Sequence, residues 1–269
     1  MLRLPAVAGR FYPSNPAELT ALIHKYVVSD PSTPAIQVRA CLVPHAGYAY
    51  SGHVAGAVLA RIALPRKIII LGVRHYPRGE PAAVLSNGSW RTPLGDAQID
   101  EELAEALKKA CPLLREDSVA HSTEHSLEVQ LPFLQILAPE FRFVPVALGT
   151  VRFEQLAEVG EGLARVLNNR NDDVLLLTTS DLNHYEDDAT TRVKDRKAIE
   201  QLLALEPRVL YDTCRHETIS MCGLGPATAM LTAMNRLGVK KSELVKYATS
   251  ADVSGDRSAA VGYAGMLFS

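Results

Sequence analysis

One stretch indicates the fold of this chain most clearly. It is Lys67-Ile-Ile-Ile-Leu-Gly-Val73, which is followed by Arg74 and His75. Its first seven residues form a short apolar run rich in isoleucine, which is typical of a strand buried on both faces of a parallel sheet. In open α/β folds, ligands bind at the carboxyl ends of the strands. The stretch therefore predicts a buried strand that delivers an imidazole to a ligand-binding edge.

Two other stretches repeat this arrangement. The run RACLVP (39–44) is followed by His45, and DVLLLTTS (173–180) is followed by Asp181 and His184. A single histidine at such a position is more often structural than functional. Here the same placement occurs three times among only eight histidines. We therefore expect three adjacent parallel strands that bring these side chains to one edge of a sheet.

The rest of the chain alternates between strand and helix patterns. Further strands are predicted at 141–149, 259–268 and 81–86. Helices are predicted at 15–28, 52–63, 99–110, 125–138, 153–169, 191–205 and 223–237. This alternation indicates a single α/β domain over residues 1–269, with a mainly parallel or mixed central sheet flanked by helices on both faces. The segment SDPSTPAI (29–36) is interpreted as a helix-to-strand loop.

Composition excludes several functional classes. The 269 residues are 47% hydrophobic and 22% charged, which suits an ordinary globular core. A net charge of −2 gives no reason to expect nucleic acid as a partner. No apolar run approaches the roughly 18 residues of a membrane span, and the N-terminus does not resemble a signal peptide. We expect a cytoplasmic protein without membrane partners, whose four cysteines are reduced.

Cys222 lies in the Gly-rich stretch SMCGLGP (220–226), directly before a predicted helix. A cysteine near a helix N-terminus is favoured as the thiolate by the helix dipole. A thiolate with two imidazoles would suit zinc, copper or ferrous iron. The alternative is that Cys222 only packs beneath the turn. The glycines could also suit phosphate, but no Lys-Ser/Thr pair follows them.

The stretch HSTEH, residues 121–125, matches the H-x-x-E-H motif of one zinc peptidase class. That chemistry requires both histidines on one face of a helix. Ser122 instead resembles a helix N-cap, with His125 in the first turn and His121 outside the helix. Glu124 is then expected to be a first-turn carboxylate near a helix N-terminus. We therefore disfavour the peptidase hypothesis.

Seven motifs occur in order along the chain and resemble those of one known family. They are AVAGRFYP, VPHAGYAYSG, ILGVRHYPRG, RTPLGDAQID, EHSLEVQLPFL, TSDLNHYED and CGLGPATAML. Over essentially its whole length the chain resembles the MEMO family, whose prokaryotic members are also called AmmeMemoRadiSam system protein B. That family is similar in fold to the LigB-like class III extradiol dioxygenases, which hold ferrous iron with two histidines and a carboxylate.

The resemblance implies a metal site in which a cysteine replaces the carboxylate. Its metal ligands would be His45, His75 and Cys222, with Fe(II) as the first expectation and copper or zinc as alternatives. Catalytic groups would be His125, His184 and Asp181. One departure is visible, since the family usually has Pro and Ser or Asn where this chain has Val73 and Arg74. A bulky cation beside the ligand could alter substrate preference.

The same resemblance leaves two functions open. The first is dioxygenase or other oxidoreductase chemistry on a small-molecule substrate. The second is a non-catalytic module that binds a protein or peptide and retains an enzyme-like cleft, because a thiolate ligand could suppress ordinary ring cleavage. AMMECR1-like and radical SAM proteins are the partners that the resemblance implies.

Overall fold

The computed structural model describes residues 1–28, 34–150, 152–170 and 173–269. Their strands are β1 (Leu2–Arg3), β2 (Ala40–Val43), β3 (Lys67–Val73), β4 (Ala82–Val84), β5 (Ser89–Thr92), β6 (Gly95–Ile99), β7 (Arg115–Glu116), β8 (Arg142–Leu148), β9 (Val174–Thr179), β10 (His184–Glu186), β11 (Ser242–Thr249) and β12 (Ala260–Phe268). Their helices are α1 (Pro16–Tyr26), α2 (Tyr48–Leu59), α3 (Glu101–Ala110), α4 (Leu131–Leu137), α5 (Phe153–Asn168), α6 (Asp188–Leu203), α7 (Pro207–His216), α8 (Leu224–Arg236) and α9 (Ala251–Ser254).

The centre of the sheet is four parallel strands in the order β8-β3-β9-β2. The three strands predicted to end at the site are thus adjacent, with Lys67 paired to Val174 and Ala40 paired to Leu176. Antiparallel β12 continues the sheet beyond β2, and β10 and β11 pair with β12. The expected mixed α/β sheet is confirmed, and its central strands all present their carboxyl ends to the same edge.

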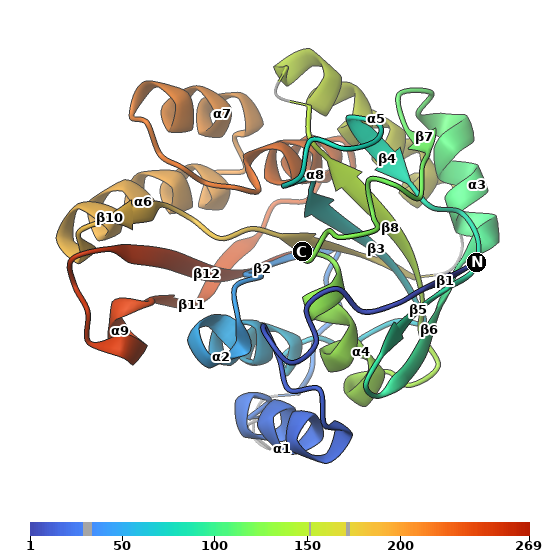
Figure 1. Cartoon of the computed structure of the whole chain (residues 1–269). Helices are drawn as coiled ribbons and strands as arrows, with labels where there is room; N and C mark the ends of the chain where they lie inside the picture. The colour runs from blue at the N-terminus through green and yellow to red at the C-terminus, as the bar shows by residue number, and fades with distance from the viewer. Residues whose placement is uncertain (29–33, 151, 171–172) are drawn as a thin grey trace.

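Side chains of the central strands alternate between two separate cores, one on each face of the sheet. Ile69 and Leu71 point into the core covered by α3, α5, α6, α7 and α8. Ile68 and Ile70 point into the core covered by α1, α2 and α4. Figure 1 shows these two helical layers with the sheet between them. The continuous apolar run in β3 follows from this burial on both faces, because neither face meets water.

Polar side chains fix where several helices begin. Asn15 accepts hydrogen bonds from the backbone N–H groups of Ala17 and Glu18, and Pro16 occupies the first turn of α1. The carboxylate of Asp100 caps α3 through the N–H of Leu103. Asp187 caps α6 in the same way. Each cap accepts a hydrogen bond from an N–H group of the first turn, for which the helix itself has no acceptor.

The sequence-based assignment was wrong at one helix start and missed several elements. The predicted helix at 125–138 begins later, as a 3₁₀ turn over Glu128–Gln130 that leads into α4. The hairpin of β5 and β6, strand β11 and helix α7 were not predicted. Strand β11 pairs with β12 among the described residues, and its side chains from Ser242 to Tyr247 are exposed or half-buried, so it lacks the continuous apolar run of a buried strand. In the predicted loop 29–36, residues 29–33 lie outside the described part of the chain.

A buried carboxylate joins α6 to the C-terminal strands. Asp195 is fully buried and accepts hydrogen bonds from the N–H of Asn183 at 2.8 Å and from the hydroxyl of Tyr247 at 2.7 Å. Burial raises the pKa of Asp195 from 3.8 to about 6, although both hydrogen bonds act in the opposite direction. The folded protein therefore binds a proton here more tightly than the unfolded chain does.

The raised pKa of Asp195 predicts that the wild type and Asp195→Asn differ in free energy of unfolding by an amount that depends on pH. The raised pKa stabilises the wild type fully below pH 4, and that contribution is lost as the pH rises through about 6. Between pH 4 and pH 7, the free energy of unfolding of Asp195→Asn should rise relative to that of the wild type by about 2 kcal/mol. Urea denaturation of both proteins at several pH values measures this. A constant difference would refute the assigned shift.

Candidate metal centre

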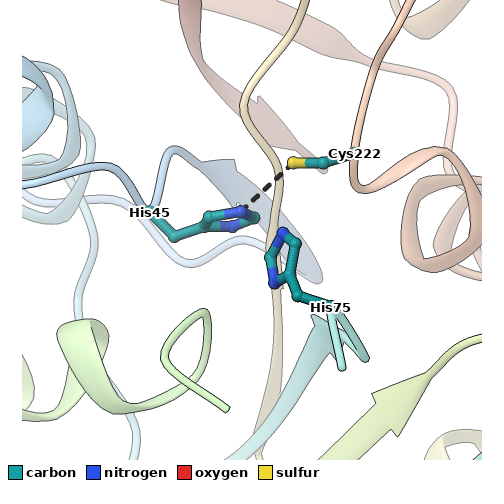
Figure 2. Close-up of side chains that lie close together, drawn as sticks. All are labelled: His45, His75 and Cys222. Carbon is teal, nitrogen blue, oxygen red and sulfur yellow. Dashed lines mark hydrogen bonds between the residues drawn. The ribbon is translucent and has the colours of Figure 1, made fainter. Parts of the chain in front are cut away.

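His45, His75 and Cys222 converge at the carboxyl edge of the central strands (Figure 2). His45 follows β2, His75 follows β3, and Cys222 precedes α8. The Nε2 atom of His45 lies 3.1 Å from the Sγ atom of Cys222, and one donor atom from each of the three residues falls within 4.8 Å of the others. Residues that are 30 and 147 positions apart thus form a compact group of nitrogen and sulfur donors.

His45 is held by the last residue of the neighbouring strand β9 and by the loop that follows it. Its Nδ1 atom lies 2.5 Å from the hydroxyl oxygen of Thr179, and its backbone N–H donates to Asp181 at 2.8 Å. When Nδ1 carries the proton and donates to Thr179, the Nε2 lone pair faces the sulfur. Burial lowers the pKa of His45 well below its usual value, with the neighbouring histidines adding to the effect. The ring is therefore neutral, as a metal ligand must be.

Glu124 contacts both the backbone N–H and the ring Nδ1 of His75, as Asp181 and Thr179 do for His45. One carboxylate oxygen accepts from the backbone N–H of His75 at 2.8 Å, and the other lies 2.9 Å from its Nδ1. Burial acts to raise the pKa of Glu124, but the hydrogen bond from His75 and nearby histidine charge outweigh it and leave the pKa at about 2. An ionised carboxylate on Nδ1 leaves Nε2 free to bind and makes it a stronger donor.

The structure corrects the expectation for Glu124. It is completely buried and lies in an irregular segment before the 3₁₀ turn, not in a helix. Ser126 from this segment accepts a hydrogen bond from the N–H of Val73, and the chain passes so close to Gly72 that a side chain there would collide with Leu127. This close approach places Glu124 over the end of β3. No local sequence pattern indicates such a contact, because it joins residues 49 positions apart.

The HSTEH motif does not form the peptidase arrangement. Residues 121–125 are not helical, and the hydroxyl of Ser122 donates to the carbonyl of Val119 instead of capping a helix. His121 lies edge-on to Trp90 and away from His45 and His75, and neither of its ring nitrogens has a hydrogen-bond partner within the described residues. The N-cap prediction is wrong, while His121 lies outside the metal-ligand group as expected.

The three residues expected to be catalytic also line this site. The ring of His125 stacks on that of His75 with centroids 4.5 Å apart, and its Nδ1 lies 3.6 Å from Glu124. Burial lowers the pKa of His125 to about 4. Asp181 lies with a carboxylate oxygen 4.0 Å from Nε2 of His45, and burial raises its pKa. His184 has its Nδ1 3.0 Å from the carbonyl of Ser220, which leaves Nε2 available to the cavity.

The helix dipole was expected to stabilise Cys222 as a thiolate, but its surroundings in the fold favour the protonated thiol. Burial and the nearby charge of Asp181 raise the pKa of the thiol far above its usual value. The hydrogen bond from the backbone N–H of Asp181, at 3.3 Å, does not offset this effect. A bound cation would supply the missing stabilisation, because metal binding deprotonates a coordinating thiol.

These side chains line a cavity of about 610 Å³ that opens to solvent. Its walls also include Phe11, Tyr185 and Tyr263. Arg74 does not line it, so the cation that follows β3 is directed elsewhere. His24 and His216 are exposed and remote from the ligand group, while His53 packs against Tyr26. The expected site residues are therefore brought together without the remaining histidines.

The chain matches the family model described as Memo-like protein over residues 3–267. This chain belongs to the MEMO family. It is 41% identical to a MEMO1 family protein of Methanopyrus kandleri, over 100% of this chain and 99% of that protein. It is 40% identical to a MEMO1 family protein of Aquifex aeolicus, over 99% of each.

One solved structure has a similar fold. An uncharacterized protein of Escherichia coli K12 is similar with a TM-score of 0.59 and 12% identity, covering 86% of this chain and 100% of that one. At this identity the likeness concerns the fold alone. Among the described residues of this MEMO protein, no helix has the length and apolar character needed to cross a membrane.

Proposed function

We propose that this MEMO protein binds ferrous iron through His45, His75 and Cys222 and carries out oxidoreductase chemistry on a small substrate. The convergence of two imidazoles and a thiol, with 3.1 Å between His45 Nε2 and Cys222 Sγ, carries the proposal. Nitrogen and sulfur donors suit ferrous iron, copper and zinc. The two Nδ1 contacts support it further, because metal-binding histidines almost always donate their other N–H to a neighbouring oxygen.

Ferrous iron in this position would supply Lewis acidity and one-electron redox chemistry when bound. The surrounding residues provide proton transfer and substrate orientation. His125 is neutral at pH 7, because burial places its pKa near 4, so it can accept a proton from a substrate hydroxyl. Nε2 of His184, which lines the same cavity, can donate to or accept from the same substrate. Phe11 and Tyr263 contribute ring surface that limits water around a bound molecule.

Metal analysis tests the proposal directly. After anaerobic reconstitution with Fe(II) and gel filtration, the wild type should retain about one iron per chain, and His45→Ala should retain almost none. His24→Ala is the matched control, because His24 is an exposed residue of α1. Failure of the wild type to retain iron, copper or zinc above the level of His45→Ala would refute the metal site.

The rim of the cavity favours a second candidate, a non-catalytic peptide-binding module. Tyr185 is 77% exposed and has a positive φ of 62°, a conformation that is costly for a bulky residue. An exposed aromatic ring beside a cavity is a frequent anchor for a protein partner. Partner capture that survives His45→Ala but is lost in Tyr185→Ala would favour this function. Oxygen consumption with a catechol that requires His45 would exclude a purely non-catalytic role.

A further inference from the structure

A smaller cavity of about 270 Å³ lies on the other side of Cys222 from the main one. Cys222 lines both cavities, whereas His45 and His75 line only the larger one. The wall of the smaller cavity includes two cationic side chains, Arg74 and Arg215, and no acidic residue from the described part of the chain. The proposed metal chemistry does not use this cavity, so its positive lining requires a separate explanation.

Two hydrogen bonds hold the guanidinium of Arg74 in place, but they involve only some of its N–H groups. Its Nη1 donates to the backbone carbonyls of Arg78 at 3.2 Å and of Gly79 at 2.8 Å. Its Nε is buried against Gly149 and has no hydrogen-bond partner within the described residues. No carboxylate forms an ion pair with Arg74 in that part of the chain. Protein encloses this Nε, but the described residues give no hydrogen-bond partner to Nη2, which leaves that group to donate to an acceptor in the cavity.

Arg215 reaches the same cavity from the end of α7. Its Nη1 contacts the hydroxyl of Tyr211 at 3.5 Å, and its guanidinium carbon lies 5.5 Å from the centre of that ring. This aromatic contact orients the guanidinium but does not neutralise it, because a phenol has no charge at neutral pH. As with Arg74, no carboxylate of the described residues pairs with it. Two uncompensated cations therefore line one small cavity.

The first turn of α8 adds to the positive potential. Leu224, Gly225 and Pro226 line the cavity, and α8 continues for 13 residues to Arg236. In this turn the N–H of Leu224 donates to the carbonyl of Met221 and Pro226 has no N–H, so Gly225 supplies the free N–H among the described residues, and the helix dipole is positive at this end. Helix N-termini and forked guanidinium donors are both used to bind oxyanions. Here these two features lie in one concavity.

We propose that this cavity binds a tetrahedral oxyanion, either free phosphate or the terminal phosphoryl group of a small molecule. The cavity is slightly below the range of about 300–1,000 Å³ that is typical of pockets for drug-sized ligands, so it suits a ligand of few atoms. The planar forks of Arg74 and Arg215 match the geometry of phosphate oxygens. The site does not require a metal, but its occupant lies directly behind the thiol that we propose as a metal ligand.

Isothermal titration of the metal-free protein with inorganic phosphate, at constant ionic strength, tests this site. We expect saturable binding with one phosphate per chain, and at least tenfold weaker binding by Arg74→Gln and by Arg215→Gln. Arg78→Gln is the matched control, because it belongs to the same loop but its side chain lines a different cavity. His45→Ala should still bind phosphate, so failure of the metal site and failure of the anion site are distinguishable.

Methyl phosphate distinguishes the two sources of the anion. Binding as tight as that of phosphate indicates a terminal phosphoryl group, whereas binding at least tenfold weaker indicates the free ion. The absence of saturable phosphate binding would overturn the proposal. Equal weakening by Arg78→Gln and Arg74→Gln would also overturn it, because the attraction would then be a general effect of surface charge.

Discussion

Cys222→Ala is expected to lose stoichiometric iron and to weaken metal binding by a factor on the order of 100 or more. Replacement of groups that merely orient metal ligands typically costs 10–100-fold in affinity, and removal of a ligand should cost at least as much. No other thiol can substitute, because Cys41, Cys111 and Cys214 are buried and belong to none of the potential metal-ligand groups among the described residues. Competition with a chromophoric chelator measures the dissociation constant.

Cys214→Ala is the matched control for removal of a thiol. Cys214 is buried in α7 and belongs to none of the groups of potential metal ligands among the described residues. The Cys214→Ala variant should bind metal with wild-type affinity, although the cavity left by the missing sulfur will lower its free energy of unfolding. Cys222→Ala should remain folded, because Cys222 lines two cavities and is not among the side chains of the two hydrophobic cores. An iron affinity equal to that of the wild type in Cys222→Ala would eliminate the thiol as a ligand.

Glu124→Gln is expected to weaken metal binding 10–100-fold and to destabilise the fold by about 1–3 kcal/mol. Glu124 accepts hydrogen bonds from the backbone N–H of His75, from its Nδ1 and from the N–H of Ser126. A glutamine has one acceptor oxygen and one NH₂ group, so one of these donors would face another donor. The ring of His75 then loses the partner that fixes its tautomer.

Glu128→Gln separates the effect on the metal from the effect on stability. Glu128 is also buried, and it accepts from Arg3, Tyr12 and the backbone N–H groups of residues 6 and 7, without contact to His75. Glu128→Gln should destabilise the protein about as much as Glu124→Gln does. It should leave the metal dissociation constant within about twofold of the wild-type value. If the two variants lose metal affinity equally, Glu124 acts only through the stability of the fold.

The positions of the site histidines were largely predictable because each follows a distinctive local pattern. A continuous apolar run reports burial on both faces, and a polar side chain directly after it lies at the strand end. Strands β2, β3 and β9 and the residues that follow them are therefore where the sequence placed them. Strand β11 and the short helix α7 lack such a continuous apolar run, because most side chains of β11 are exposed or half-buried and α7 buries only Leu210 and Cys214.

Glu124 shows where local patterns stop being informative. Read alone, HSTEH has the spacing of a peptidase motif or of a helix start, since both depend on near neighbours in the chain. The structure replaces these alternatives with a contact to His75, 49 residues earlier. The ionisation state of Cys222 is similarly nonlocal, because burial and Asp181 outweigh the helix terminus that adjoins it.

The sequence by itself determined the α/β class, the central strands and the residues that meet at their ends, because hydrophobic periodicity reports which surfaces avoid water. Only the tertiary structure decided which of those residues touch, which nitrogen of each histidine is left free, and that Arg74 lines a separate cavity behind Cys222. Those outcomes depend on hydrogen bonds and burial between segments distant in the chain, and side-chain spacing along one segment carries no information about them.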